Sequence, residues 1–245
     1  MDKKEGLIVG RNAVMQALES DRTIDSVTVA EGQRGSQAAK IIEICREKRI
    51  PVKYADSRKL DKLCGGAAHQ GVAAFAAAHD YAELDDIFNL AQSRGESPFI
   101  VICDGLEDPH NLGAILRTAE AAGVHGVIIP KRNSVTLNYT VAKTSAGAIE
   151  YVPVVKVTNI AGTIDTLKGR GVWVFGADME GTPWTELDFT GSVALVIGSE
   201  GRGLSKLVRE KCDFIASLPM KGKINSLNAS VAAGILMFEA SRQRK

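Results

Sequence analysis

Apolar runs of strand length alternate with helical patterns through the C-terminal part of the chain, and this rhythm limits the fold more than any other feature. The runs are uninterrupted, as in buried parallel sheets, so we predict an α/β fold with a mainly parallel sheet. Strands are expected over residues 99–103, 126–129, 172–175, 193–197 and 214–218. Helices are expected over residues 112–122, 140–148, 160–168 and 204–211, and a last helix runs from Leu227 to Arg242.

The first 78 residues show a similar alternation on a smaller scale, which predicts a small α/β sandwich. Its expected helices cover residues 12–20, 36–48 and 57–64, and its expected strands residues 24–29, 52–54 and 71–78. Residues 79–97 are polar and acidic around one amphipathic piece at 84–90. We therefore predict three parts: a domain over 1–78, a linker with a helical turn over 79–97, and a domain over 98–245.

Charge and cysteine content narrow the possible environments and partners. The chain has 30 Lys and Arg against 29 Asp and Glu, so its net charge does not indicate a nucleic acid partner. Residues 1–78 carry a net charge of +3, which fits an RNA-facing surface and an ordinary solvated surface about equally well. Four scattered cysteines without a C-x-x-C pair predict reduced thiols in a cytoplasmic protein, with no metal site. No apolar run has the length of a signal peptide or membrane span.

Two loops in the last quarter of the chain are rich in small residues. Gly198-Ser199-Glu200-Gly201-Arg202-Gly203 follows an apolar strand, and Asn225-Ser226-Leu227-Asn228-Ala229-Ser230 leads into the last helix. Glycines let a backbone approach a ligand closely. The start of a helix offers unpaired N–H groups. Together the loops predict a pocket for a polar, adenosine-like molecule.

A third segment, Asp104-Gly105-Leu106-Glu107-Asp108-Pro109-His110-Asn111-Leu112-Gly113-Ala114-Ile115-Leu116-Arg117-Thr118-Ala119-Glu120, precedes these loops. With the two loops and Leu218-Pro219-Met220, it resembles the three signature motifs of the SpoU (TrmH) family, in the same order and across roughly residues 98–242. These proteins are RNA ribose 2'-O-methyltransferases of the SPOUT class. The resemblance implies an S-adenosylmethionine cofactor, a trefoil knot at the donor site and a homodimer. An apolar stripe on the last helix would fit a dimer interface or the core: Leu227, Val231, Ile235 and Phe238.

The resemblance also assigns site residues. It places S-adenosylmethionine among the backbones of Gly198, Leu218 and Leu227, with Gly203, Ser226 and Asn228 nearby. It gives catalysis to Arg117, supported by Asn111, Glu200, Ser226 and Asn228. An arginine is a poor base because its pKa exceeds about 12, so we expect Arg117 to bind phosphate and stabilise a developing alkoxide. Asn111 lies six residues earlier, off the face of Arg117, and is expected in the loop or cap before the helix.

The N-terminal segments Gly10-Arg11-Asn12-Ala13-Val14 and His69-Gln70-Gly71-Val72 resemble the L30e-like substrate-binding domain found in many SpoU enzymes. Arg11, Asn12 and His110 are accordingly candidates for RNA contact. Simpler interpretations are helix initiation for Asn12, a polar loop residue for His110, and a surface pair with Glu120 for Arg117.

The nearest match within the family is the RlmB type, so the resemblance implies methylation of a guanosine 2'-hydroxyl in large-subunit ribosomal RNA. A tRNA 2'-O-methyltransferase of the same family is the near alternative, and a non-catalytic RNA-binding ribosome-assembly protein is a second. A dinucleotide-dependent enzyme is disfavoured, because the glycines follow G-x-x-G-x-G order and come late in the chain.

Overall fold

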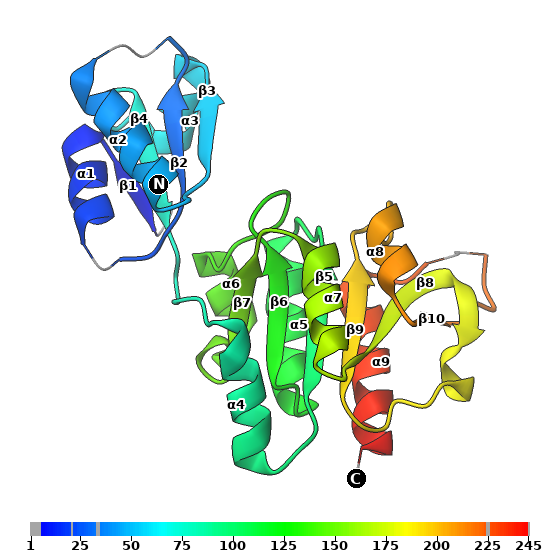
Figure 1. Cartoon of the computed structure of the whole chain (residues 1–245). Helices are drawn as coiled ribbons and strands as arrows, with labels where there is room; N and C mark the ends of the chain where they lie inside the picture. Colours follow the sequence, from blue (N-terminus) through cyan, green and yellow to red (C-terminus); the bar gives the residue numbers. More distant parts are fainter. Residues whose placement is uncertain (1–5, 21, 33–34, 224–225, 245) are drawn as a thin grey trace. The chain divides into compact units, whose positions relative to one another are not determined.

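The computed structural model describes residues 6–20, 22–32, 35–223 and 226–244. The chain divides into two compact units, each with its own sheet (Figure 1). Unit 1 comprises Met1–Asp80 with Thr136–Tyr139, and unit 2 comprises Tyr81–Val135 with Thr140–Lys245. The α/β fold class that the sequence predicts is confirmed.

Unit 1 is a four-stranded sheet in the order β1-β4-β2-β3 with three helices. Its strands are β1 (Leu7–Val9), β2 (Ile24–Ala30), β3 (Val52–Ala55) and β4 (Val72–Ala76), and its helices α1 (Arg11–Glu19), α2 (Ser36–Glu47) and α3 (Ser57–Cys64). Helices α1 and α2 cover one face of the sheet, where Val14 and Ile41 pack on Val27. The short α3 packs on the other face through Leu60. The sequence analysis missed β1, whose three residues are too few to show a pattern.

Unit 2 is a six-stranded sheet in the order β10-β8-β9-β5-β6-β7, and all its pairs are parallel. Helices α4, α7 and α8 pack on one face, and α5 and α9 contact the other (Figure 1). The strands are β5 (Phe99–Asp104), β6 (Gly126–Pro130), β7 (Val154–Val157), β8 (Trp173–Pro183), β9 (Val193–Gly198) and β10 (Phe214–Ser217). The helices are α4 (Leu84–Arg94), α5 (Pro109–Ala121), α6 (Tyr139–Thr144), α7 (Ile160–Gly169), α8 (Lys206–Lys211) and α9 (Ala229–Gln243), with short 3-10 turns at Ala148–Glu150 and Trp184–Glu186.

Several element boundaries differ from the sequence prediction for local reasons. The helix expected over 140–148 ends at Thr144, because Ala146 and Gly147 adopt left-handed backbone angles (φ of 51° and 90°). Strand β8 extends well beyond the expected residue 175, into polar sequence that carries no strand pattern. Strand β7 was not predicted, since its four residues are buried only in their first half.

The segment predicted as a linker contains a longer, packed helix. Helix α4 has 11 residues rather than one turn, and Ile87 on it is fully buried in the core of unit 2. The fit is close: a Cβ at Gly126 on β6 would lie 2.4 Å from the Ile87 Cγ1 atom. Residues from Tyr81 onward therefore belong to unit 2. Where the sequence predicted a linker with a helical turn over 79–97, the structure has a packed helix, because apolar side chains of α4 fill the space beside Gly126.

Candidate functional site

The carboxyl ends of β5 and β9 meet at the centre of the parallel sheet of unit 2. The two strands pair along their length, and Asp104 lies opposite Gly198. From β5 the chain builds outward to β6 and β7 on one side, and then returns to build β8, β9 and β10 on the other. Open α/β sheets bind ligands outside the carboxyl ends of strands at such a reversal. Two of the three motifs found in the sequence begin at this place.

Three of the predicted catalytic side chains form one hydrogen-bonded cluster. The Asn111 Nδ2 atom donates to Glu200 Oε1 at 2.7 Å, and the Asn228 Nδ2 atom donates to the same oxygen at 2.8 Å. Asn228 Nδ2 also donates to Asn111 Oδ1 at 3.0 Å. Glu200 and Asn228 lie 89 and 117 positions after Asn111 in the sequence. The cluster therefore ties α5, the loop after β9 and the start of α9 together.

The helices that carry Asn111 and Asn228 begin at other residues than the sequence predicted. Asp108 caps α5 by accepting the His110 N–H at 2.8 Å, and Pro109 begins the helix. Asn111 thus lies inside the first turn, 5% exposed, and is not the cap.

Asn228 is the cap of α9, which begins at Ala229. Its Oδ1 atom accepts the N–H groups of Ser230 at 3.0 Å and Val231 at 3.4 Å. Asn228 therefore satisfies two of the N–H groups that the sequence analysis expected to be unpaired at the start of this helix.

The loop after β9 closes on itself. The Ser199 N–H donates to the Gly203 carbonyl at 3.0 Å, and the Gly203 N–H donates back to Ser199 at 2.9 Å. A Cβ at Gly198 would lie 2.2 Å from the Gly203 carbonyl carbon. Glycine is therefore required at 198 by the loop's own backbone, whatever a ligand requires. Gly203 needs glycine for another reason, its left-handed φ of 64°.

Asp104 supports this loop and was not identified from the sequence. Its Oδ2 atom accepts the Ser205 N–H at 2.8 Å, just before α8. Its position, an acidic residue directly after an apolar strand, was the one feature of the sequence that could have indicated this role.

The other predicted site residues of unit 2 do not join the cluster. Arg117 is exposed on α5, and it makes no side-chain hydrogen bond or ion pair with any described residue, Glu120 included. Ser226 is exposed and likewise makes no side-chain hydrogen bond within the described residues. Leu218 is half-buried and Leu227 is 38% exposed. His110 is exposed. Asn225 of the quoted motif lies outside the described residues.

The two N-terminal motifs meet in unit 1. The Gly10 N–H donates to the Val72 carbonyl at 3.0 Å, and Arg11 Nε donates to the Gln70 carbonyl at 2.8 Å. Asn12 Oδ1 accepts from Gln37 Nε2 at 2.7 Å. Arg11 and Asn12 thus hold their own unit together, and their contact with RNA stays a prediction.

Both parts of the chain match known protein families. The family model described as the SpoU rRNA Methylase family matches residues 98–238. The chain belongs to the SpoU family. A second model, described as RNA 2'-O ribose methyltransferase substrate binding, matches residues 7–82. As a SpoU family member, the chain is an RNA methyltransferase with S-adenosylmethionine as its methyl donor.

Relatives of similar length support the membership in the SpoU family. A Bacillus subtilis protein assigned to the TrmH family of tRNA/rRNA methyltransferases is 49% identical, with 100% of this chain and 98% of the relative covered. A Staphylococcus haemolyticus protein of the same assignment is 50% identical, with 97% and 96% covered.

Two solved structures share the SpoU fold. The SpoU methyltransferase AviRb from Streptomyces viridochromogenes, in complex with AdoMet, has a TM-score of 0.61 and 26% identity, with 97% of this chain and 89% of that chain covered. The A. aeolicus TrmH/SpoU tRNA modifying enzyme has a TM-score of 0.56 and 29% identity, with 65% and 84% covered.

No helix among the described residues is long and apolar enough to cross a membrane. They also contain no group of three or more His, Cys, Asp or Glu side chains that could hold a metal ion.

Proposed function

We propose that the protein methylates the ribose 2'-hydroxyl of a guanosine in large-subunit ribosomal RNA, using S-adenosylmethionine. The observation that carries the proposal is the cluster of Asn111, Glu200 and Asn228 at the carboxyl ends of β5 and β9. It joins side chains of all three motifs at the place where open α/β sheets bind ligands. All three side chains are ones that the family resemblance assigns to catalysis, which favours an enzyme over a ribosome-assembly factor.

The residues present fit the methyl donor. The closed loop from Gly198 to Gly203 offers uncovered backbone at its three glycines, and Leu218 and Leu227 offer partly exposed apolar surface for an adenine ring. Ser226 and Asn228 add polar groups at the start of α9. S-adenosylmethionine, when bound, supplies the methyl group from its sulfonium. We propose that these six residues hold it, with Asn111 and Glu200 fixing the loops around it.

Arg117 is proposed to bind the phosphate next to the target ribose and to stabilise the alkoxide that forms at the 2'-oxygen. Its guanidinium has no partner among the described residues, so its donors are available to substrate. A cation that keeps its proton throughout suits charge that develops only in the transition state. Asn12, Arg11 and His110 are proposed to contact RNA outside the reacting nucleotide.

A homodimer is proposed to complete the site. Val231 and Phe238 on α9 are 50% and 54% exposed, so this part of the stripe does not serve the core. Helix α9 packs beside α5, which carries Arg117. Pairing through α9 would bring Arg117 of one subunit near the donor loops of the other. We also propose the family's trefoil knot around these loops, and a cytoplasmic location where RNA substrate and reduced thiols coexist.

The choice of ribosomal RNA over tRNA as the substrate is argued from the N-terminal unit. Residues 7–82 match a substrate-binding model, whereas the A. aeolicus tRNA modifying enzyme is matched over only 65% of this chain. This additional unit favours a larger RNA, and tRNA stays the alternative.

The deciding experiment incubates the purified protein with radiolabelled S-adenosylmethionine and either ribosomal RNA or tRNA from a strain lacking the gene. Mass spectrometry then locates the methylated nucleotide. We expect a 2'-O-methylguanosine in large-subunit RNA. Label in tRNA alone would move the substrate to the alternative, and label in neither RNA would reject the proposed function.

A further inference from the structure

The second face of the unit 1 sheet is covered over only part of its length. Helix α3 packs through Leu60 and Cys64 on Ala30 and Ala73. Because strand residues alternate between faces, Ser26 and Thr28 of β2 share this face with Ala30. Their register neighbours are Phe75 on β4 and Lys53 on β3. The end of the sheet that α3 leaves uncovered is hollowed into a cavity of about 690 Å³.

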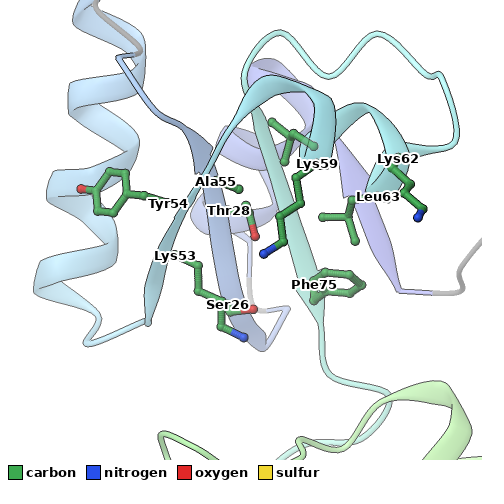
Figure 2. Close-up of a pocket in the computed structure, with 10 residues that line it drawn as sticks. Ser26, Thr28, Lys53, Tyr54, Ala55, Lys59, Lys62, Leu63 and Phe75 are labelled. Atoms are coloured by element: carbon green, nitrogen blue, oxygen red, sulfur yellow. The ribbon is translucent and has the colours of Figure 1, made fainter.

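The cavity contains polar atoms without protein partners. Ser26 and Thr28 are only 8% and 7% exposed, yet neither hydroxyl makes a hydrogen bond to a described residue. Both line the cavity floor (Figure 2). Both hydroxyls open onto the cavity and are not sealed from solvent, so they are available to a polar group of a bound molecule.

Cations surround this floor. Lys53, Lys59 and Lys62 line the cavity, and within the described ranges none of them forms a side-chain ion pair. No acidic residue is among the described residues that line it. Figure 2 shows the Lys59 chain descending from α3 towards Thr28 and Phe75. The charge favours an anion, and the volume lies within the ~300–1,000 Å³ typical of sites for small organic groups.

Apolar surface lies beside the cations. Phe75 and Leu63 are half-buried on the cavity wall. Lysines for phosphate, an aromatic ring for stacking and hydroxyls for a base or ribose edge are the groups that bind single-stranded RNA. A base paired within a duplex could not enter such a hollow.

A second hollow of about 650 Å³ continues the basic surface along α3. It shares Lys59 and Lys62 with the first, and adds Arg58. The acidic residue among its described lining residues, Asp56, is the cap of α3, where its Oδ1 atom accepts the Lys59 N–H at 2.8 Å. Phosphates on either side of a captured nucleotide could follow this surface.

We propose that the cavity between α3 and the β2–β3–β4 end of the sheet captures one unpaired nucleotide of the RNA substrate, which rests on the proposed function. Lys53, Lys59 and Lys62 bind its phosphates, Phe75 packs on its base, and Ser26 and Thr28 read its polar edge. The site lies on the face opposite α1 and α2, and so differs from the predicted contacts at Arg11 and Asn12.

The charge contribution is tested with two triple variants of the full chain. Lys53→Gln, Lys59→Gln and Lys62→Gln remove the cavity cations; Arg22→Gln, Lys40→Gln and Arg46→Gln remove three exposed cations away from the cavity. The probe is a fluorescein-labelled, single-stranded RNA decamer of mixed sequence. We expect the cavity variant to lose at least tenfold in affinity, with a salt slope smaller by about 2, and the control to change by less than twofold. Equal losses in both would overturn the site.

The hydroxyl contribution has a sharper signature. Since Thr28 Oγ1 has no partner among the described residues, Thr28→Val should leave stability unchanged or raise it, yet weaken RNA binding severalfold. Thr28→Ser should keep most of the affinity. A destabilised Thr28→Val protein, or one that binds the decamer like wild type, would contradict the assignment of this hydroxyl to a ligand.

Turnover separates this site from the proposed function. With radiolabelled S-adenosylmethionine and ribosomal RNA, the cavity variant should show a KM raised at least tenfold and a near-normal kcat at saturating RNA. If wild type methylates no RNA, the proposed function fails while the decamer still tests the cavity. If wild type methylates RNA and the cavity variant keeps its KM, the nucleotide site is rejected.

Discussion

The two polar sites of this protein differ in how their hydrogen bonds are used. In unit 2, Asn111, Glu200 and Asn228 bind one another, and Asn228 also caps α9. In unit 1, Thr28 and Lys59 face a cavity with their side-chain polar groups unpartnered within the described residues. Groups that bind one another fix a geometry, whereas unpartnered groups are available to bind something else. We infer that the first site is built to position loops and the second to capture a ligand.

Arg117 is the exception within unit 2, since it is exposed and unpartnered like the lysines of the cavity. It therefore gives the largest expected effect. Arg117→Ala should lower kcat by about 10²–10³ and leave S-adenosylmethionine affinity nearly unchanged. Arg117→Lys should restore little, because a point charge cannot copy the planar guanidinium. Single-turnover methyl transfer and titration calorimetry measure the two quantities.

Subunit mixing tests whether this arginine serves its own chain or the partner. A heterodimer of Arg117→Ala with a donor-loop variant such as Gly198→Val should recover partial activity from two inactive parents. No recovery in verified heterodimers would place each arginine in its own site, and an active Arg117→Ala homodimer would remove it from the mechanism.

The next largest effects are expected at Gly198 and Gly203, two glycines of the same loop. Gly198→Ala should shift the loop backbone, because its Cβ would collide with Gly203, and we expect at least a tenfold loss of S-adenosylmethionine affinity together with lower stability. Gly203→Ala meets no atom within 4 Å and carries only the left-handed strain of about 1–2 kcal/mol. Calorimetry and urea unfolding compare them. Equal effects would show that the collision at Gly198 does not matter.

Glu200 tests whether the cluster of unit 2 is held by its hydrogen bonds. Glu200→Ala leaves the buried Asn111 amide without its acceptor, so the free energy of unfolding should fall by about 1–3 kcal/mol. Glu200→Gln keeps an acceptor oxygen, so its free energy of unfolding should fall by less. Both tryptophans, Trp173 and Trp184, lie in unit 2, so their fluorescence reports on this unit. A fully stable Glu200→Ala protein would mean that the cluster is incidental.

The sequence predicted the features that depend on neighbouring residues, and it did not predict those that depend on residues far apart in the chain. Uninterrupted apolar strands predicted the α/β class, and α3 was predicted to the residue, since Asp56 caps it and Gly65 ends it. Helix α4 was underestimated because its burial depends on Gly126, 39 residues after Ile87 and invisible to local pattern.

The site shows the same division between local and distant information. Motif residues Asn111, Glu200 and Asn228 were foreseen as members, but their mutual hydrogen bonds span 28 to 117 positions and could not be read from spacing. The close approach of Gly203 to Gly198 depends on how the loop closes, so the sequence could not show this second reason for a glycine. The unit 1 cavity was missed because scattered lysines, hydroxyls and Phe75 form no motif.

The smallest expected effect concerns His125, a fully paired group of unit 2. Its side chain is buried; Nδ1 accepts the Phe99 N–H at 2.9 Å and Nε2 contacts Glu96 at 3.1 Å. Burial lowers the pKa of His125 below its ordinary 6.5, and this outweighs the opposing influence of the Glu96 carboxylate. The unfolded chain therefore takes up a proton on acidification before the folded protein does. The resulting stability is fully present above about pH 6.5 and is lost as the pH falls towards the lowered pKa.

His125→Gln removes the titrating ring, so its unfolding free energy, followed by tryptophan fluorescence in urea, should decline less between pH 7 and 5 than that of wild type. Parallel declines would show that His125 already carries its proton when folded, and that this part of unit 2 is not held by a neutral imidazole.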